Sequence, residues 1–439
     1  DRPHVLAPGS GTMNSDAAAP MGGRPLPRSA HWAVQAGVLF LGMAVVNAGN
    51  YGLNLVMGRL LPPADFAEAT VLNTIVLLVA CVAVAAQVTL AQVLAEASAS
   101  SSAPSTANAQ AIRAAGRRFA AIAGVSLGLL LAAITPILET KLHLRSPASI
   151  YLLAASIPGY LFLCVGRGRL QAEGATQRLA GTFQLEMAVR FAATVVLLRS
   201  GLGLFGAAIA LSLSIFVPLL LLPRDGEPGV IDRAMTTKLR KIFVTAGASQ
   251  LAVVLFNQSD IFVAKWKFSS EESGQFSAIL IIARIVFFAT FALVTALVPT
   301  VAAKARRGEP HGRVAVSALL AVTGIGAPIV LVAYVAPALV MQTLLGGNYG
   351  ALAGSLGTYA LGTLLFSLAN ILVDYHLALG VRAPAFLAVA AGLGTALVGA
   401  RYATSPGALA ATHLHGAAFA FALVAAFAGL RRLFLGAHP

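Results

Sequence analysis

Four apolar runs of this sequence contain ionisable side chains at places where charge is costly. Glu186 and Arg190 lie four residues apart in one run, and Asp260, Arg284 and Asp374 lie in three others. A charge at the centre of a membrane helix costs about 2.5 to 3.5 kcal/mol on insertion scales, so it requires a partner, water or a ligand. These five residues are therefore the first candidates for binding or ion coupling.

The two arginines are predicted to lie at a similar depth. Arg190 and Arg284 each fall about eight residues inside their runs, counted from the same side, which is roughly 12 Å along a helix. Two guanidinium groups, one from each half of the chain, are suited to bidentate binding of a phosphate. In the structural alternative, Glu186 neutralises Arg190 at i,i+4 spacing and Asp260 neutralises Arg284 from a neighbouring helix. Both interpretations remain open.

The three carboxylates are candidates for coupling transport to an ion. A desolvated carboxylate can exchange H⁺ or bind Na⁺, and Asp260 is the most central of the three. Asp374 and Glu186 are further candidates. The alternatives are a counter-ion role for Asp260 and Glu186 and interfacial solvation for Asp374, which lies beside His376.

A row of amides predicts a polar path. Asn47, Asn50 and Asn54 recur every three to four residues and share one helix face. They are expected to line a hydrated, sugar-tolerant path together with amides of a later run, or alternatively to form interhelical hydrogen bonds worth about 0.6 kcal/mol each. The predicted substrate-binding residues are Arg284, Arg190, Asn50, Asn257 and Gln258.

Other common chemistries are not signalled by the sequence. It contains no GxxxxGK[ST], GxSxG or HExxH motif. Cys81 and Cys164 lie in apolar runs without metal-ligand spacing, and His413 and His415 point to different helix faces. We therefore expect no metal, no cofactor and no enzymatic activity.

The composition predicts a membrane protein. Of 439 residues, 58% are hydrophobic and 10% charged, whereas soluble chains carry roughly 25% charged residues. This excludes a cytosolic enzyme and a disordered scaffold. The net charge of +14 would suggest nucleic acid as the partner of a soluble protein, but in a membrane protein it reflects basic cytoplasmic loops.

Twelve apolar runs are long enough to cross a bilayer, which requires about 20 residues. With both termini cytoplasmic, the inner segments hold 21 of the 30 Lys and Arg residues and the outer segments hold 7, which supports this orientation. The runs cover 33–58, 66–94, 119–138, 150–165, 179–198, 202–222, 242–263, 276–303, 314–335, 351–377, 386–400 and 408–430.

The longest polar connection lies between the sixth and seventh runs and divides the chain into similar halves. The segment 61–67 aligns with 268–274, and Asn50 with Asn257, at an offset of 207 residues, and Gly174 aligns with Gly380 at 206. Six runs per half imply a parallel repeat. The predicted parts are a disordered cytoplasmic tail (1–32), a six-helix bundle (33–222), a cytoplasmic linker (223–241), a second six-helix bundle (242–430) and a cytoplasmic tail (431–439).

Several segments together resemble a known transporter family. GRLLPPADFA (58–67) follows the pattern x-R-x-L-G-P-x-E/D-[YF]-G, with Pro62 and Ala67 in place of glycines. GRLQAEG (168–174), NQSD (257–260), EESGQF (271–276), ARI (283–285) and Val298-Pro299 match in order and spacing. In these segments the chain resembles the polysaccharide transporter family of the multidrug/oligosaccharidyl-lipid/polysaccharide flippase superfamily.

This resemblance implies an all-α, V-shaped pair of six-helix bundles, about twelve spans in all, in a bacterial inner membrane. The implied activity is flipping of a polyprenyl-pyrophosphate-linked oligosaccharide by alternating access. The implied partners are this lipid-linked glycan, membrane lipids, H⁺ or Na⁺, and the polymerase and glycosyltransferases of glycan synthesis. The alternatives are a multidrug or cation antiporter of the same superfamily and a membrane glycan polymerase or ligase. An apolar outer connection, 336–350, is short for such an enzyme.

Overall fold

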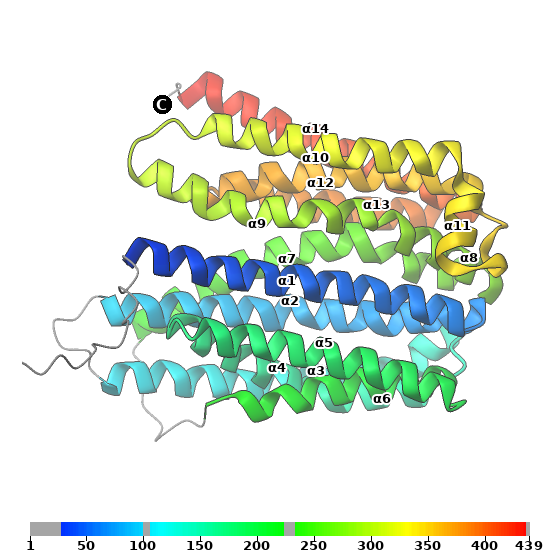
Figure 1. Cartoon of the computed structure of the whole chain (residues 1–439), viewed down its shortest axis with the longest axis horizontal. Coiled ribbons are helices and arrows are strands. Elements are labelled where there is room, and N and C mark those ends of the chain that lie inside the picture. Colours follow the sequence, from blue (N-terminus) through cyan, green and yellow to red (C-terminus); the bar gives the residue numbers. More distant parts are fainter. Residues whose placement is uncertain (1–27, 100–105, 224–232, 436–439) are drawn as a thin grey trace, which may run out of the picture.

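The computed structural model describes residues 28–99, 106–223 and 233–435, and it is helical throughout these ranges, with short turns between helices. The helices run side by side in two stacked groups, which we call the N-lobe (α1 to η1) and the C-lobe (α7 to α14) (Figure 1). The lobes converge at the end where α11 lies and diverge toward the end that carries the C-terminus (Figure 1). The predicted all-α, V-shaped architecture is confirmed.

The N-lobe consists of six membrane-length elements. The last of them changes from an α-helix to a 3₁₀ turn at Val217-Pro218, because proline lacks the N–H that the α-helix would use. The elements are α1 (Arg28–Leu60), α2 (Pro63–Ala99), α3 (Thr106–Leu142), α4 (Pro147–Ala172), α5 (Thr176–Arg199) and α6 (Gly203–Phe216) with η1 (Val217–Leu221).

The C-lobe repeats this plan with two differences. Its second span is broken at Arg284 into two helices, and a short helix with two 3₁₀ turns connects its third and fourth spans. The elements are α7 (Arg233–Lys267), α8 (Ser270–Ala283), α9 (Ile285–Arg306), α10 (Gly312–Val335), α11 (Pro337–Leu345), η2 (Gly347–Tyr349), η3 (Ala353–Ser355), α12 (Leu356–Ala378), α13 (Ala383–Tyr402) and α14 (Pro406–Leu435).

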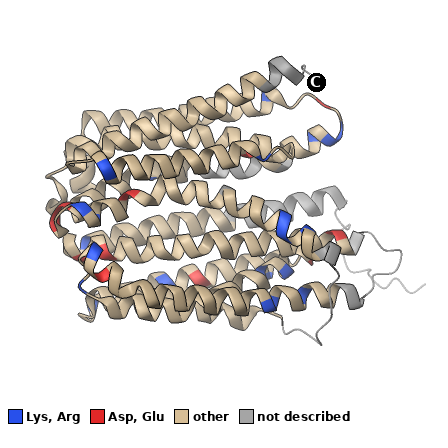
Figure 2. Cartoon of the chain, turned by 180° about the vertical axis from the view of Figure 1, so that it is seen from behind, with Lys and Arg blue, Asp and Glu red and all other residues tan. Residues whose placement is uncertain are grey.

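The surface of both lobes suits a hydrocarbon solvent. Within the described residues, eleven helical segments are long and apolar enough to cross a membrane. The remaining predicted span coincides with α1, whose side chains are described from Gly42 onward. Large apolar side chains such as Ile122, Leu129 and Leu397 are more than 60% exposed, and charged residues gather at the two ends of the helices (Figure 2). The chain is a multi-pass membrane protein.

Helix boundaries repeat at the predicted offset. α1 ends at residue 60 and α7 at 267, and α2 begins at 63 and α8 at 270, so both boundaries recur after 207 residues. Gly174 after α4 and Gly380 after α12 both have positive φ, 67° and 76°, which glycine adopts without the steric cost of a side chain. The internal repeat read from the sequence therefore matches the helix boundaries.

Several helix boundaries differ from the predicted ones. The span 276–303 contains a one-residue turn at Arg284, and the connection 336–350 contains the short helix α11 and the 3₁₀ turn η2. Of the predicted tail 1–32, residues 1–27 lie outside the described residues, and α1 begins at Arg28. Of the predicted linker 223–241, residues 224–232 lie outside the described residues, and α7 begins at Arg233. The predicted tail 431–439 is helical up to Leu435, and residues 436–439 lie outside the described residues.

Candidate functional site

A cavity of about 180 Å³ lies between the two lobes. It brings Arg190 of α5 and Arg284 of the broken span together with the asparagines of α1, as predicted for a shared site. Gln258 lines it as well, whereas Asn257 does not. The lining residues are Asn47, Asn50, Tyr51, Leu53, Asn54, Met57, Ala69, Leu72, Asn73, Leu77, Arg190, Thr194, Ala207, Leu211, Gln258, Ile281, Arg284 and Phe288.

On the N-lobe side, Arg190 is held by a buried ionic cluster. Glu186 accepts from Arg190 one helical turn away, which confirms the i,i+4 pair, and also from Arg167 Nη2 at 2.7 Å. Arg190 in addition donates to Ser214 Oγ at 3.1 Å and to Asn50 Oδ1 at 3.4 Å. Two guanidinium groups thus share one carboxylate, so the cluster keeps one positive charge in excess, with Arg190 at the cavity wall.

Arg167 corrects the prediction based on loop charges. The sequence places it in an inner loop, but it lies within α4 and is 2% exposed. Its Nε donates to Thr182 Oγ1 at 2.9 Å, and its guanidinium lies over the ring of Phe183 at 3.9 Å. Arg167 therefore contacts Glu186, which in turn contacts Arg190.

On the C-lobe side, Arg284 interrupts the helix at the cavity. α8 ends at residue 283 and α9 begins at 285, with Arg284 between them. Its Nη2 donates to the carbonyl of Asn257 on α7, whereas its buried Nε has no hydrogen-bond partner among the described residues. Within the described ranges, no acidic side chain lies within 4 Å to pair with Arg284. The predicted Arg284–Asp260 ion pair is therefore not formed.

The cavity wall leaves other polar atoms unpaired. Tyr51 and Asn54 line the cavity, and their buried Oη and Oδ1 atoms, like Arg284 Nε, have no hydrogen-bond partner in the described part of the chain. Buried polar groups in native proteins are nearly always hydrogen-bonded, so three such atoms around one cavity indicate water or a ligand. Tyr51 also meets Phe288 edge to face at 6.3 Å, which gives one wall an aromatic surface.

The cavity is basic and rich in amides. Among the residues that line it in the described part of the chain, two are arginines and none is Asp or Glu. Gln258 Oε1 accepts from Thr74 on α2 at 3.0 Å, which links the lobes, and Asn257 Nδ2 donates to Val253 O on its own helix. Asn73 and Thr194 also line the cavity, and they were not predicted because neither belongs to a spacing pattern in the sequence.

Asp260 lies inside the C-lobe, in a buried cluster that the sequence did not reveal. Its Oδ2 accepts from Tyr359 Oη at 2.9 Å and lies 3.0 Å from His413 Nδ1, without a hydrogen bond between the carboxylate and the ring. The rings of His413 and Tyr359 stack at 4.0 Å, and all three residues are at most 3% exposed. His413, expected to be non-functional, is thus the basic neighbour of Asp260.

This arrangement predicts which substitutions depend on each other. Asp260→Asn and His413→Gln should shift the melting temperature non-additively, because the two side chains are in contact. Asp260→Asn and Arg284→Gln should be closer to additive, because no ion pair joins them. Thermal unfolding of the purified single and double variants in detergent measures both cycles. A larger coupling for Asp260 with Arg284 than with His413 would restore the counter-ion hypothesis.

Asp374 does not join either group. It accepts from Asn370 Nδ2 at 3.1 Å one turn away on α12, and it is not among the residues lining the cavity. Glu186 reaches the cavity only through Arg190. Among the described residues, Asp260 thus lies beside a histidine and a tyrosine, whereas Glu186 lies beside two arginines.

The two lobes are joined at the end that carries α11. Arg59, the last arginine of α1, donates to the carbonyls of Thr343 (2.6 Å) and Leu344 (2.9 Å), which are free acceptors at the C-terminal turn of α11. Tyr349 Oη donates to Leu61 O at 3.2 Å, and burial raises the pKa of Tyr349, so its hydroxyl keeps the proton that it donates. The C-lobe segment α11–η2 thus fastens the lobes together.

Comparisons with solved structures show which known proteins have a similar fold. No protein-family model matches the chain, and no curated protein matches it. Among solved structures, an inward-facing multidrug resistance MATE family transporter of the MOP superfamily matches with a TM-score of 0.75 and 16% identity, covering 91% of this chain and 97% of that one. An outward-facing structure of such a transporter matches with a TM-score of 0.66 and 17% identity, covering 92% and 96%.

A third solved structure is a MOP superfamily transporter from Pyrococcus furiosus Vc1, for which a reversed polarity of the binding pocket is described as suggesting a different function. It matches with a TM-score of 0.63 and 18% identity, covering 90% of this chain and 93% of that one. The chain therefore has the MATE transporter fold, and the inward-facing form resembles it more than the outward-facing form does.

Proposed function

We propose that this protein is a MOP-superfamily transporter that carries an anionic, phosphate-bearing amphiphile across a bacterial inner membrane by alternating access. The observation that carries the proposal is the cavity: Arg190 and Arg284 enter it from opposite lobes, and no carboxylate lines it within the described residues. A cationic drug would be repelled by this wall. A phosphate would be bound by both guanidinium groups.

The finer proposal is a polyprenyl-pyrophosphate-linked oligosaccharide as the substrate. The pyrophosphate supplies the negative charge that Arg190 and Arg284 neutralise, and the amides of Asn50 and Gln258 offer hydrogen bonds to a polar head group. A cavity of about 180 Å³ is smaller than typical ligand sites of roughly 300 to 1,000 Å³, so this state holds the charged group alone. Wider separation of the lobes accommodates the glycan.

The energy source in this proposal is an ion gradient acting at Asp260. Its carboxylate is buried in the C-lobe, where binding H⁺ or Na⁺ changes its attraction for His413 and its hydrogen bond from Tyr359. The same α7 supplies the carbonyl of Asn257 to Arg284, one turn from Asp260. Ion binding at Asp260 is thereby linked to the position of Arg284. The proposed orientation has both termini and the open end of the V in the cytoplasm.

A multidrug antiporter is the second candidate, and the comparisons favour it more than they favour a flippase. The similar solved structures include multidrug transporters, and the edge-to-face pair of Tyr51 and Phe288 offers a surface for an aromatic drug. The two candidates differ in the charge of the substrate.

Reconstituted proteoliposomes with an imposed H⁺ or Na⁺ gradient distinguish the two candidates. We expect transbilayer movement of an NBD-labelled polyprenyl pyrophosphate, followed by dithionite quenching, and no gradient-driven movement of ethidium. Asp260→Asn should abolish the acceleration by the gradient. Movement of ethidium without movement of the pyrophosphate lipid would establish the antiporter and refute the anionic substrate.

A further inference from the structure

A buried ion pair connects the two lobes at the end that carries α11. Glu68 lies in the second turn of α2 and Lys265 in the last turn of α7, so the pair crosses the boundary between the N-lobe and the C-lobe. Lys265 Nζ lies 3.9 Å from Glu68 Oε1. Glu68 is 2% exposed and Lys265 1%, so the lobes must be in contact here to exclude water from both charges.

The two charges of this pair are unequally satisfied. Glu68 Oε1 accepts from the backbone N–H of Arg145 at 2.7 Å, whereas Lys265 Nζ has no hydrogen-bond partner among the described residues. The side chain of Arg145 instead donates to Asp65 Oδ1 at 3.4 Å. A buried ammonium group has lost its hydration, and a carboxylate at 3.9 Å replaces only part of it. Contact between the lobes therefore has an electrostatic cost at Lys265.

The same two helices form a second ion pair at the opposite end, where the lobes diverge. Lys238 of α7 donates to Glu96 of α2, and these side chains are 48% and 52% exposed. Water thus reaches the pair where the lobes are apart and is excluded from the pair where they meet. Separation of the lobes at the α11 end would hydrate Glu68 and Lys265 in the same way.

The internal repeat does not duplicate the buried pair. At the repeat offset of 207 residues, Glu68 corresponds to Gln275. Lys265 corresponds to Gly58, where an added Cβ would overlap Leu345 of α11. The position equivalent to the pair is therefore uncharged and is covered by α11. The two sides of the α11 end are held by different contacts, and the side formed by α2 and α7 contains the buried charges.

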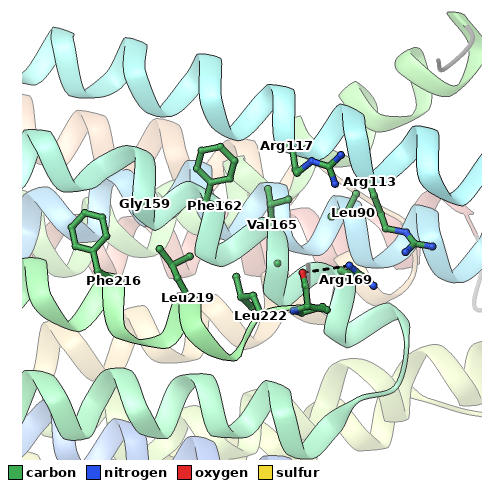
Figure 3. A pocket seen from close by; sticks show the side chains of 12 residues that line it. Leu90, Arg113, Arg117, Gly159, Phe162, Val165, Arg169, Phe216, Leu219 and Leu222 are labelled. Carbon is green, nitrogen blue, oxygen red and sulfur yellow. Dashed lines mark hydrogen bonds between the residues drawn. The ribbon is translucent and has the colours of Figure 1, made fainter. Parts of the chain in front are cut away.

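A larger hollow, of about 700 Å³, lies within the N-lobe and is not part of this contact. Figure 3 shows its arginines at one end and the rings of Phe162 and Phe216 at the other. All the residues that line it belong to the N-lobe, so relative movement of the lobes leaves its walls together. The Glu68–Lys265 pair has one partner in each lobe, so the same movement separates its charges.

We propose that the Glu68–Lys265 pair sets the balance between the closed and the open form of the α11 end by making the closed form less stable. The inference rests on the alternating access of the proposed function. Both charges lose water when the end closes and regain it when the end opens. Replacing a buried ion pair by neutral side chains of similar size is often neutral or stabilising, whereas removing one partner leaves an uncompensated charge. Removing one charge should therefore open this end, and removing both should not.

The test measures how fast a cysteine at Asn54, in the interlobe cavity, reacts with a membrane-impermeant maleimide from the side that carries α11. Glu68→Gln and Lys265→Met should each raise the rate at least about tenfold, because each leaves a buried charge without its counter-ion. Glu68→Gln/Lys265→Met leaves neither charge, keeps an acceptor for the N–H of Arg145 and keeps the apolar stem of Lys265. This double variant should react at or below the rate of the parent.

The matched control is Lys238→Met, which removes a lysine of the same helix from the exposed pair and should leave the rate unchanged. Thermal unfolding in detergent identifies any single variant that does not fold, and the double variant then decides alone. A double variant that reacts faster than the parent would overturn the proposal, because the attraction itself would hold the end closed. Parent rates in both folded single variants would also overturn it. Failure of the wild type to move the pyrophosphate lipid would refute the proposed substrate without changing these rates.

Discussion

Replacing Arg284 with alanine should reduce transport of the NBD-labelled polyprenyl pyrophosphate by at least about 100-fold. A hydrogen bond to a charged group is worth about 1.5 to 3 kcal/mol, which corresponds to roughly 10- to 150-fold, and alanine removes the whole fork together with its charge. Arg284→Lys keeps the charge and loses the planar fork, so it should retain partial activity. The initial rate in proteoliposomes measures both variants.

The abundance of the alanine variant should remain near normal. Arg284 has no acidic partner within 4 Å among the described residues, so its removal breaks no contact ion pair there. Arg199→Ala, an exposed arginine at the end of α5 that does not line the cavity, is the matched control and should transport normally. Wild-type transport by a well-folded Arg284→Ala protein would remove Arg284 from the proposed mechanism.

Replacing Gly274 with valine should open the end of the molecule that α11 closes. Gly274 lies in the first turns of α8, and a Cβ there would overlap the backbone of Pro63 at the start of α2. Backbone cannot rotate away as a side chain can, so the lobes must separate at this point. A cysteine at Asn54 in the cavity should then react with a membrane-impermeant maleimide from outside, several-fold faster than in the Gly274 parent.

Two controls accompany this measurement. Gly324→Val adds the same side chain to α10, where a Cβ meets no atom within 4 Å, and should leave the labelling unchanged. A cysteine at Ser146, between α3 and α4, should label from outside in every background if the proposed orientation is right. Equal protection of the Asn54 cysteine in the parent and in Gly274→Val would show that this contact does not hold the end closed.

The fold was largely predictable because its signals are periodic and cumulative. Long apolar runs predict membrane spans. Gly174 and Gly380 indicate the repeat, because they occupy corresponding positions and each follows a helix with positive φ. The break at Arg284 was not predictable, because no Pro or Gly marks it and the flanking residues are all apolar. The fold of 336–350 was missed because nine helical residues are too few to show a clear period.

The candidate site was predictable only to the level of residue type. Intramembrane charge singled out Arg190, Arg284 and Asp260, and two of these meet in the cavity. Their partners were not predictable, because sequence distance says nothing about which helices touch. His413, 153 residues after Asp260, was set aside for its spacing from His415, yet it lies beside Asp260. Arg167 was counted as a loop charge because it follows a run that looked short.

Pro63 and Gly274 meet where the two halves of the chain join, and this contact bears on how far the sequences of the halves could diverge. The turn before α2 and the turn before α8 are corresponding copies within the repeat, so the closed end resembles the two-fold interface of a homodimer whose subunits have been fused. In a homodimer both subunits have the same sequence, so a glycine that is required in one subunit is also present in the other. In a fused chain the two copies can differ. Gly274 leaves room for the backbone of Pro63, whereas the corresponding residue of the first copy, Ala67, has a side chain that is completely buried.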